Sequence, residues 1–288
     1  EYPEFRFLQS QPHLYRMLKE RDPELYERVR RAARRGQLIP DGGMWVEADV
    51  NLTGGESLVR QFIHGKRFFR EEFGVECAVL WLPDVFGYSG ALPQIMLGCG
   101  ARYFATAKIF WNYHGGDPFP HNTFVWRGID GSEVLTHFIT APCGERFQTY
   151  NGEITPRFIK GTWDDYRDKR VNDEVLFAFG WGDGGGGPTE AMLEAGRRIP
   201  DLPALPAVRQ DSAESFFRRL ESRDDVGRDH REGQDAKRRD FVGLEYPVAE
   251  HVEVERDSRH RHEPAYFDEP FAQQAHPGHS SAKSFLMH

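Results

Sequence analysis

The chain has 288 residues, with 37 Lys and Arg against 45 Asp and Glu and a formal net charge of −8. This acidic balance disfavours non-specific nucleic-acid binding, and no stretch resembles a membrane span or an amino-terminal signal peptide. The three cysteines are too few for a disulfide scaffold and lack metal-ligand spacing. They indicate reduced thiols, so we expect a cytoplasmic protein that binds neither nucleic acid nor membranes.

Helical patterns dominate the first part of the chain. Residues 12–35 predict two short helices, divided where Asp22 precedes Pro23 as an N-cap precedes a proline in the first turn. Residues 56–73 predict a third helix, because their apolar residues recur at helical spacing and Gly74 follows as a stop signal.

A strand–helix–strand unit follows. The nearly continuous apolar run 75–82 is typical of a strand covered on both faces, and it leads through a predicted helix at 92–97 to a strand at 102–106. Residues 122–126 and 133–139 predict a β-hairpin with an Asp-Gly turn between its strands.

Strands and helices continue to alternate up to about residue 220. We expect strands at 174–179 and 204–208, a helix capped by Thr189, and a helix at 211–220. This alternation predicts an α/β fold with a parallel sheet.

The composition changes near residue 222. Residues 222–288 hold seven of the twelve histidines, only two leucines and no isoleucine. Such a segment buries too little apolar surface to offset its ordering entropy, so we expect disorder there. His260 and His262 share one side of an extended chain but lack the rigid support that a metal site needs. The chain therefore divides into a folded region at 1–221 and a charged, histidine-rich tail at 222–288.

Asp84 is the first candidate for chemistry. It follows a buried strand directly, at the end where α/β sheets and barrels place their reacting groups. A carboxylate there can serve as a nucleophile, a base or a metal ligand. The alternative is that Asp84 merely caps the following turn.

The glycine-rich segment after residue 179 is the second candidate. It reads GWGDGGGGPT, without the Lys-Ser/Thr ending of a P-loop or the spacing of a dinucleotide fingerprint. Phosphate binding is therefore the weaker interpretation. Backbone that approaches a ligand closely while presenting the carboxylate of Asp183 suits a sugar or metal site better.

A third set of residues suits carbohydrate binding, because an indole can stack on a sugar ring while carboxylates accept hydrogen bonds from its hydroxyls. Alternatively, Trp45 is an ordinary core residue, and Lys108 is either solvated or paired with Asp84. The candidate substrate-binding residues are Trp45, Glu47, Asp49, Lys108, Trp111 and Asn112.

Several long motifs, in order, resemble the catalytic region of the zinc-dependent retaining α-mannosidases of glycoside hydrolase family 38, in particular the cytosolic and bacterial branch. The resemblance covers about residues 2–221. The motifs are GGMWVEADVN, GGESLVRQFIHGKRFFREEFG, VLWLPDVFGYSGALPQI, KIFWN, HNTFVWRGIDGSEVL and FAFGWGDGGGGPTEAML.

The resemblance implies a seven-stranded β/α-barrel-like catalytic domain that hydrolyses terminal α-linked mannose with retention of configuration. Asp84 corresponds to the catalytic nucleophile, which in the family is also a zinc ligand. Asp183 resembles the acid/base carboxylate, and Lys108 matches a basic position near the substrate. Zinc would bind sugar hydroxyls and orient the ring rather than generate hydroxide.

The sequence departs from the family pattern at both ends. No counterpart exists here for the first barrel strand with its His-x-Asp zinc pair, or for a later zinc histidine, so Asp84 remains as the one expected ligand. We therefore expect a barrel incomplete at its N-terminus, and a tail that a shifted reading frame would explain. Two hypotheses stay open. In the first, the chain is part of an α-mannosidase that acts on α-mannosides or oligosaccharides, and the full-length protein could form homo-oligomers. In the second, the chain is an inactive fragment with at most a weak sugar-binding or scaffold role.

Overall fold

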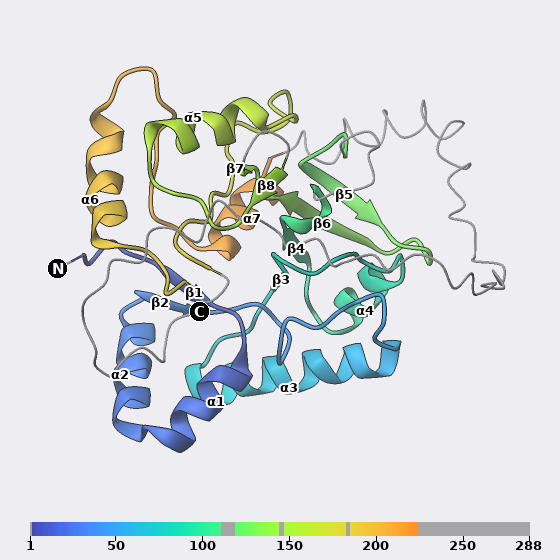
Figure 1. Ribbon diagram of the computed structural model, residues 1–288. Helices are drawn as coiled ribbons and strands as arrows, with labels where there is room; N and C mark the ends of the chain where they lie inside the picture. The colour runs from blue at the N-terminus through green and yellow to red at the C-terminus, as the bar shows by residue number, and fades with distance from the viewer. Residues whose placement is uncertain (1, 111–118, 144–146, 183–184, 224–288) are drawn as a thin grey trace, which may run out of the picture.

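The computed structural model describes residues 2–110, 119–143, 147–182 and 185–223. They form a mixed α/β fold with short strands at the centre and helices around them (Figure 1). The strands are β1 (Phe7–Gln9), β2 (Leu38–Pro40), β3 (Val79–Trp81), β4 (Tyr103–Thr106), β5 (Thr123–Arg127), β6 (Glu133–Phe138), β7 (Ala141–Cys143) and β8 (Phe147–Thr149). The α-helices are α1 (Pro12–Arg21), α2 (Pro23–Arg34), α3 (Gly55–Phe73), α4 (Leu92–Gly98), α5 (Pro156–Asp165), α6 (Glu190–Arg198) and α7 (Ala213–Glu221).

Parallel pairing runs through most of the strands. The central sheet has the order β3-β4-β6-β5, with β3, β4 and β6 parallel and β5 antiparallel at one edge. β1 and β2 form a second parallel pair, and a parallel bridge between Gly42 and Leu80 connects the end of β2 to β3. β7 and β8 pair as a separate antiparallel hairpin.

The central sheet is covered on both faces. Val79 and Tyr103 pack against α7, where the Tyr103 and Phe217 rings stack with centroids 5.1 Å apart. Leu80 and Phe104 point the other way, into a core shared with α3 and α4. Burial on both faces accounts for the apolar run that predicted this strand.

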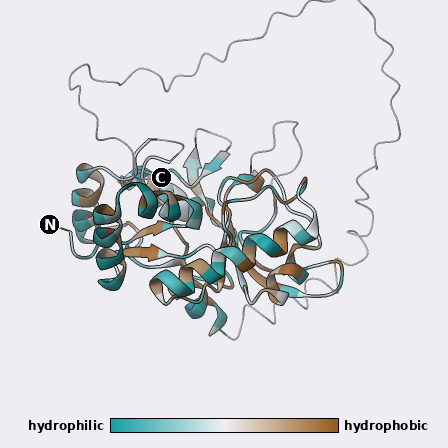
Figure 2. Ribbon diagram, turned by 90° about the horizontal axis from the view of Figure 1, so that it is seen from below, coloured by the Kyte–Doolittle hydropathy of each residue, from teal (hydrophilic) through white to brown (hydrophobic). Residues whose placement is uncertain are grey.

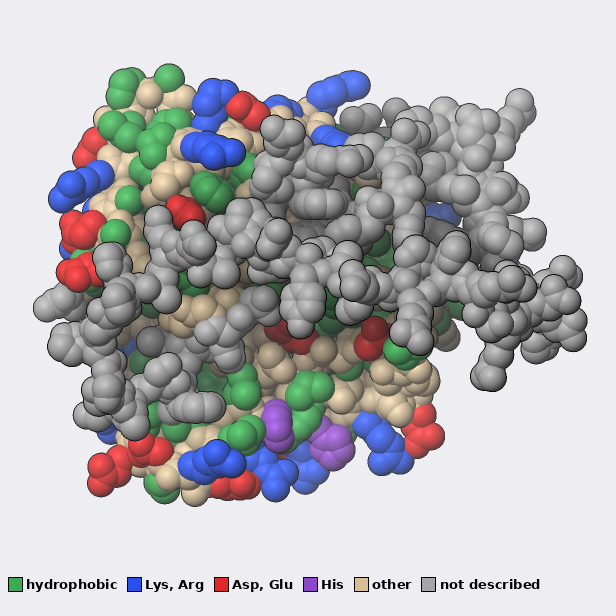
Figure 3. Space-filling model, in the orientation of Figure 1, with side chains coloured by type: hydrophobic (Ala, Val, Ile, Leu, Met, Phe, Trp, Pro, Cys, Tyr) green, Lys and Arg blue, Asp and Glu red, His purple; other side chains and the backbone are tan. Residues whose placement is uncertain are grey.

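The amino-terminal helices pack along the lower side of the molecule as Figure 1 shows it. Asp22 caps α2 as predicted, because its side chain accepts a hydrogen bond of 2.9 Å from the Leu25 N–H. The helices carry both hydrophilic and hydrophobic residues (Figure 2), and basic and acidic side chains mingle over this part of the surface (Figure 3). Exposed pairs there, such as Arg16 with Glu20, are worth little stability each.

Two predicted strands are wrong. Among the described residues, 174–179 make one ladder contact, a parallel bridge between Phe179 and Gly152. The Leu176 N–H donates to a histidine ring instead of a strand. Residues 204–208 form no strand; Ala204, at their start, adopts a left-handed φ of 66°. The predicted run at 75–82 forms a strand only over β3.

The other predicted elements are confirmed: the helices at 12–35, 56–73, 92–97 and 211–220, the Thr189 cap, the hairpin and the strand–helix–strand unit. The prediction of an α/β fold with parallel strands is therefore confirmed at the level of the described residues. The tail from 224 to 288 lies outside them.

The segment after β2 lies very close to α3. A Cβ on Gly65 would lie 2.4 Å from the Met44 carbonyl carbon and 2.5 Å from the Gly43 oxygen. Gly65 therefore sits in the middle of a helix because the backbone of residues 43–44 occupies the space that any side chain would need. This contact fixes the start of the GGMWVEADVN motif against the helix.

A buried carboxyl lies at the start of the same segment. Asp41 is 3% exposed, and its Oδ1 accepts a hydrogen bond of 2.8 Å from the Gly42 N–H. Burial raises its pKa from 3.8 to about 7, although the hydrogen bonds from Gly42 and the Cys77 thiol oppose the rise. Burial also raises the pKa of that thiol, so Cys77 stays protonated and donates.

Replacing Asp41 by Asn should make stability less dependent on pH. The folded pKa of Asp41 lies above its unfolded value, so its contribution to stability is lost as pH rises from about 4 through 7. Between pH 5 and pH 8, we expect the unfolding free energy of Asp41→Asn to rise by roughly 2 kcal/mol relative to that of the native chain. Denaturant unfolding at the two pH values measures this, and an equal difference at both would contradict it.

Replacing Gly65 by Ala should destabilise the fold although Ala favours helix. The added methyl group meets the backbone at residues 43–44, so we expect a loss of about 2–4 kcal/mol in unfolding free energy. The control is Gly196→Ala in α6, whose Cβ would make an ordinary 3.4 Å contact with Ile154. The unfolding free energy of that variant should equal that of the native chain or exceed it by up to about 1 kcal/mol. Equal effects of the two variants would refute the close approach.

Candidate functional site

The carboxyl ends of β3 and β4 bring two oppositely charged side chains together. The strands pair in register, with Trp81 opposite Ala105, and the Ala107 and Lys108 N–H groups both donate to the Pro83 carbonyl. Lys108 Nζ consequently lies 2.7 Å from Asp84 Oδ1. The two residues lie 24 positions apart in the chain, and parallel pairing places them at one edge, which favours the alternative in which Lys108 pairs with Asp84.

The ion pair is partly shielded from water. The Lys108 side chain is 12% exposed and that of Asp84 is 35% exposed, while the ammonium also lies 4.5 Å from the centre of the Phe86 ring. The attraction is therefore screened less than in a surface pair. Phe86 itself is 73% exposed, so an apolar ring face borders the charged pair.

Tyr88 fixes the loop that carries Asp84. Its hydroxyl lies 2.8 Å from the Leu82 carbonyl oxygen, to which it donates, and 2.5 Å from Thr106 Oγ1. Burial raises the pKa of the phenol; the contact with Thr106 opposes the rise, and the charges of Glu47 and Asp84 add to it. The phenol thus stays protonated and lies within electrostatic range of both carboxyl groups.

Glu47 brings a second carboxyl group to this edge. Its Oε1 accepts a hydrogen bond of 2.6 Å from Ser10 Oγ, and Ser10 follows β1 directly. Burial raises the pKa of Glu47, the hydrogen bond from Ser10 lowers it, and the negative charge of Asp84 raises it further. The site therefore contains two carboxyl groups in different surroundings, one paired with a cation and one with a hydroxyl.

A cavity of about 630 Å³ opens next to these residues. Ser10, Glu47 and Pro83 line it, so it adjoins the Asp84 loop. Aromatic rings that can stack on a sugar also line it, among them Trp81 and Trp181. Its volume suits a small organic ligand, and its lining combines apolar rings with a few polar groups.

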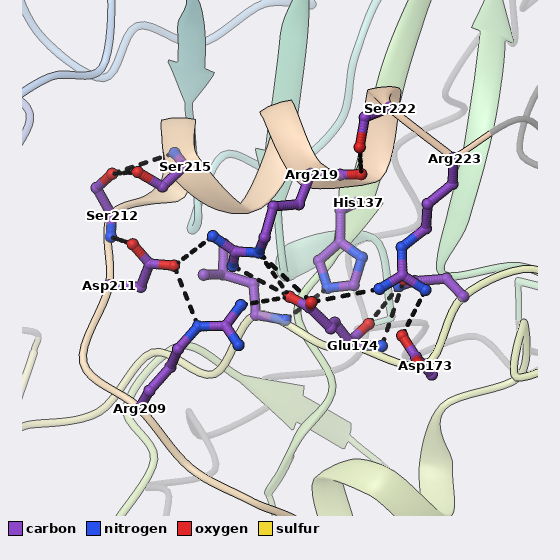
Figure 4. A network of polar contacts seen from close by, with 12 residues as sticks. His137, Asp173, Glu174, Arg209, Asp211, Ser212, Ser215, Arg219, Ser222 and Arg223 are labelled. Atoms are coloured by element: carbon purple, nitrogen blue, oxygen red, sulfur yellow. Dashed lines mark hydrogen bonds and ion pairs between the residues drawn. The ribbon is translucent and has the colours of Figure 1, made fainter.

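Acidic and basic side chains form a network along another part of the same cavity (Figure 4). Glu174 lies at its centre and meets Arg209 at 2.7 Å, Arg219 at 3.0 Å and Arg223 at 3.3 Å. Asp211 binds Arg219 from the opposite side at 2.7 Å. These charges are mutually satisfied, so the network holds residues 173–176 against α7.

His137 lies beside this network and is a packed residue. It is fully buried, and burial lowers its pKa to about 3, against the opposing influence of Asp168. Its Nε2 accepts from the Leu176 N–H at 3.2 Å, so Nδ1 carries the proton and faces Thr123 Oγ1 at 2.8 Å. A neutral, fully hydrogen-bonded imidazole of this kind orders the core.

The remaining candidates from the sequence lie elsewhere or outside the described residues. Trp45 packs against Phe68, with ring centres 5.8 Å apart, and is not among the residues that line the cavity. Asp49 accepts hydrogen bonds from two N–H groups of its own loop, at 2.9 and 2.7 Å. The candidates outside the described residues are Trp111, Asn112 and Asp183.

Sequence reasoning missed Ser10. It follows a strand of three residues, too short for a period-2 pattern to identify, and a serine there carries no signal by itself. Its relevance appears only when β1 pairs with β2 and brings Ser10 next to the segment that contains Glu47.

The described residues do not form a zinc centre by themselves. Zinc in proteins takes three or four nitrogen, sulfur or oxygen ligands. No group of three or more His, Cys, Asp and Glu side chains able to hold a metal occurs within the described ranges, and Asp84 meets the cation Lys108 instead. The expected role of Asp84 as a zinc ligand stays a prediction.

A carboxylate paired with a lysine at the carboxyl edge of parallel strands, beside a cavity with aromatic walls, defines the class of α/β proteins that bind or transform small ligands at that edge. The pattern described as the glycosyl hydrolases family 38 N-terminal domain matches residues 1–241. The chain belongs to this glycosidase family, which confirms the family inferred from the motifs. In the described part of the chain, no helix is long and apolar enough to cross a membrane.

Curated relatives carry the name α-mannosidase. The chain is 47% identical over 220 residues to alpha-mannosidase 2C1 of Homo sapiens and 44% identical over 220 residues to alpha-mannosidase G of Dictyostelium discoideum. Each match covers 76% of this chain and 20% of the relative, so the chain spans about a fifth of the length of these relatives. An α-mannosidase structure from Enterococcus faecalis V583 matches 76% of this chain and 25% of its own, with a TM-score of 0.60 and 18% identity, which supports the fold.

Proposed function

We propose that this chain contributes the nucleophile edge of an α-mannosidase that hydrolyses terminal α-linked mannose with retention of configuration. The observation that carries the proposal is the ion pair between Asp84 and Lys108 at the ends of two adjacent parallel strands. The names of the relatives support mannosides or oligosaccharides as the substrate class. A cytoplasmic location and homo-oligomers of the full-length protein belong to the same proposal.

The chemistry follows from two carboxyl groups. Asp84 attacks the anomeric carbon while the bond to the leaving oxygen breaks and an acid donates a proton to that oxygen. Water then attacks the mannosyl ester, loses a proton to the same acid/base residue and releases Asp84. We propose Asp183 for the acid/base role. Lys108 aligns the Asp84 carboxylate through the 2.7 Å contact.

Substrate binding is proposed for residues on the same edge. Glu47 lines the cavity and Lys108 meets the nucleophile, so both suit direct contacts with sugar hydroxyls. Trp45 and Asp49 suit a supporting role, because one packs behind the motif and the other orders its loop. Trp111 and Asn112 complete the proposed set. We also propose zinc for the family site, where Asp84 would be one ligand and the metal would bind and orient the sugar hydroxyls.

A barrel-like architecture completes the proposal. Parallel pairing continues from β1 through β2 and the bridge between Gly42 and Leu80 to β3, β4 and β6. A further parallel bridge joins Gly152 and Phe179. This succession supports the seven-stranded β/α barrel of the catalytic domain, with residues 1–221 forming part of it and 222–288 a separate tail.

A second candidate is a chain that binds a mannoside without turning it over. It is favoured by the Lys108 ammonium 2.7 Å from Asp84 Oδ1, which competes with any other cation for that oxygen. The two candidates differ in one measurable property, the release of an aryl leaving group.

Asp84→Asn should abolish turnover of an aryl α-mannoside, lowering kcat at least 10³-fold because the amide cannot form the glycosyl ester. The control is Glu76→Gln, whose carboxylate pairs with Arg70 on the surface before β3 begins. It should turn over like the native chain. Equal activity of the Asp84 and Glu76 variants would contradict the proposal, while sugar binding without turnover by the native chain would select the second candidate.

A further inference from the structure

A serine and a glutamate from different strand ends meet at the wall of the cavity. Ser10 is 7% exposed and follows β1 directly, and Glu47 lies seven residues beyond β2. Their side chains are joined by the 2.6 Å hydrogen bond from Ser10 Oγ to Glu47 Oε1, and both residues line the cavity. Chemistry at Asp84 does not require this contact, so it calls for a separate explanation.

Close contacts and hydrogen bonds hold the backbone around the two residues. A Cβ on Gly42 would lie 2.6 Å from Ser10 Cβ, so the segment after β2 passes directly over the serine. On the other side, the Trp45 N–H donates to the Gln61 carbonyl at 2.9 Å and the Val46 N–H to Gln61 Oε1 at 3.0 Å. Glu47 is therefore held between β1 and α3 rather than on a free loop.

The Glu47 carboxyl has acceptor capacity that the described residues leave unused. A carboxylate offers about four lone-pair sites on two oxygens. Within the described residues, Ser10 is the single hydrogen-bond partner of the Glu47 side chain, and it binds Oε1. Glu47 is half-buried at the cavity wall, and Oε2 remains for a group that enters the cavity.

We propose that Glu47 recognises one hydroxyl of the bound hexose through Oε2, and that Ser10 is the positioning residue that sets the direction of this acceptor. The inference rests on the proposed function, because the hexose must lie at Asp84 for Glu47 to reach it. It assigns substrate specificity to a polar pair formed between β1 and the segment after β2. The ligand class is a pyranose with hydroxyl groups free to donate.

The test measures binding of methyl α-mannoside and its monodeoxy analogues to the whole chain through tryptophan fluorescence, since Trp81 and Trp181 line the cavity. The variants are Ser10→Ala, which adds no atoms beside Gly42, and Glu47→Gln, which keeps the shape of the side chain. Ser132→Ala is the matched control, because it removes a serine-to-carboxylate hydrogen bond of 2.7 Å to Asp130 in an exposed turn.

We expect Glu47→Gln to weaken binding of methyl α-mannoside about tenfold and Ser10→Ala about threefold to tenfold, with Ser132→Ala binding like the native chain. One monodeoxy analogue, lacking the recognised hydroxyl, should bind all four proteins equally. Native-like binding by both variants, or the same loss for every analogue, would overturn the inference and the proposed contact of Glu47, while leaving the proposed hydrolysis at Asp84 standing. A native chain that binds no mannoside would overturn both.

Discussion

The pairing of β3 with β4 is the constraint on which the candidate site depends. Both the Ala107 and the Lys108 N–H groups donate to the Pro83 carbonyl, so the two strand ends are joined one residue before Asp84. The ion pair of Asp84 and Lys108 follows from that join rather than from any local preference of either loop. A shift of register would separate the two charges and expose a partly buried lysine.

Three carboxyl groups beside the parallel strands differ in their surroundings. Asp84 meets a cation, Glu47 meets a hydroxyl, and Asp41 is buried with a thiol and a backbone N–H. Burial raises the pKa of both Asp41 and Glu47. Asp168 shows the opposite balance: burial raises its pKa, but hydrogen bonds from His121 and the Thr123 and Asn122 N–H groups outweigh this and lower it. Burial outweighs the hydrogen bonds at Asp41 and Glu47, whereas the hydrogen bonds outweigh burial at Asp168.

Much of the fold could be predicted from the sequence because the signals were local. The Asp22 cap, the apolar stripe of α3 and the two-faced burial of β3 each depend on residues close together in the chain. The strand predicted at 174–179 failed because its apolar residues indicate burial but not a pairing partner. In the structure the Leu176 N–H donates to His137 and the Glu174 side chain binds arginines.

Some residues of the candidate site could be predicted from the sequence and others could not, again according to whether the signal was local. Asp84 and Lys108 could be predicted because each directly follows an apolar strand. Ser10 could not, because its contact with Glu47 spans 37 positions and requires β1 and β2 to pair first. Trp45 looked like a sugar platform beside carboxylates, yet its ring packs against Phe68. The sequence alone does not show whether Trp45 faces the core or the cavity. The close contact between Gly65 and residues 43–44 fixes the orientation of the motif, and it appears only in the structure.

We expect the reaction to pass through a covalent mannosyl ester on one residue. A fluorinated mannosyl fluoride, in which the ring fluorine slows hydrolysis of the glycosyl-enzyme, should add one sugar to the chain. Trypsin releases residues 71–102 as one peptide, because no Lys or Arg lies between Arg70 and Arg102. Mass spectrometry should find the sugar on Asp84 of this peptide. A sugar on Glu47, or on any other carboxylate, would contradict the assignment of the nucleophile.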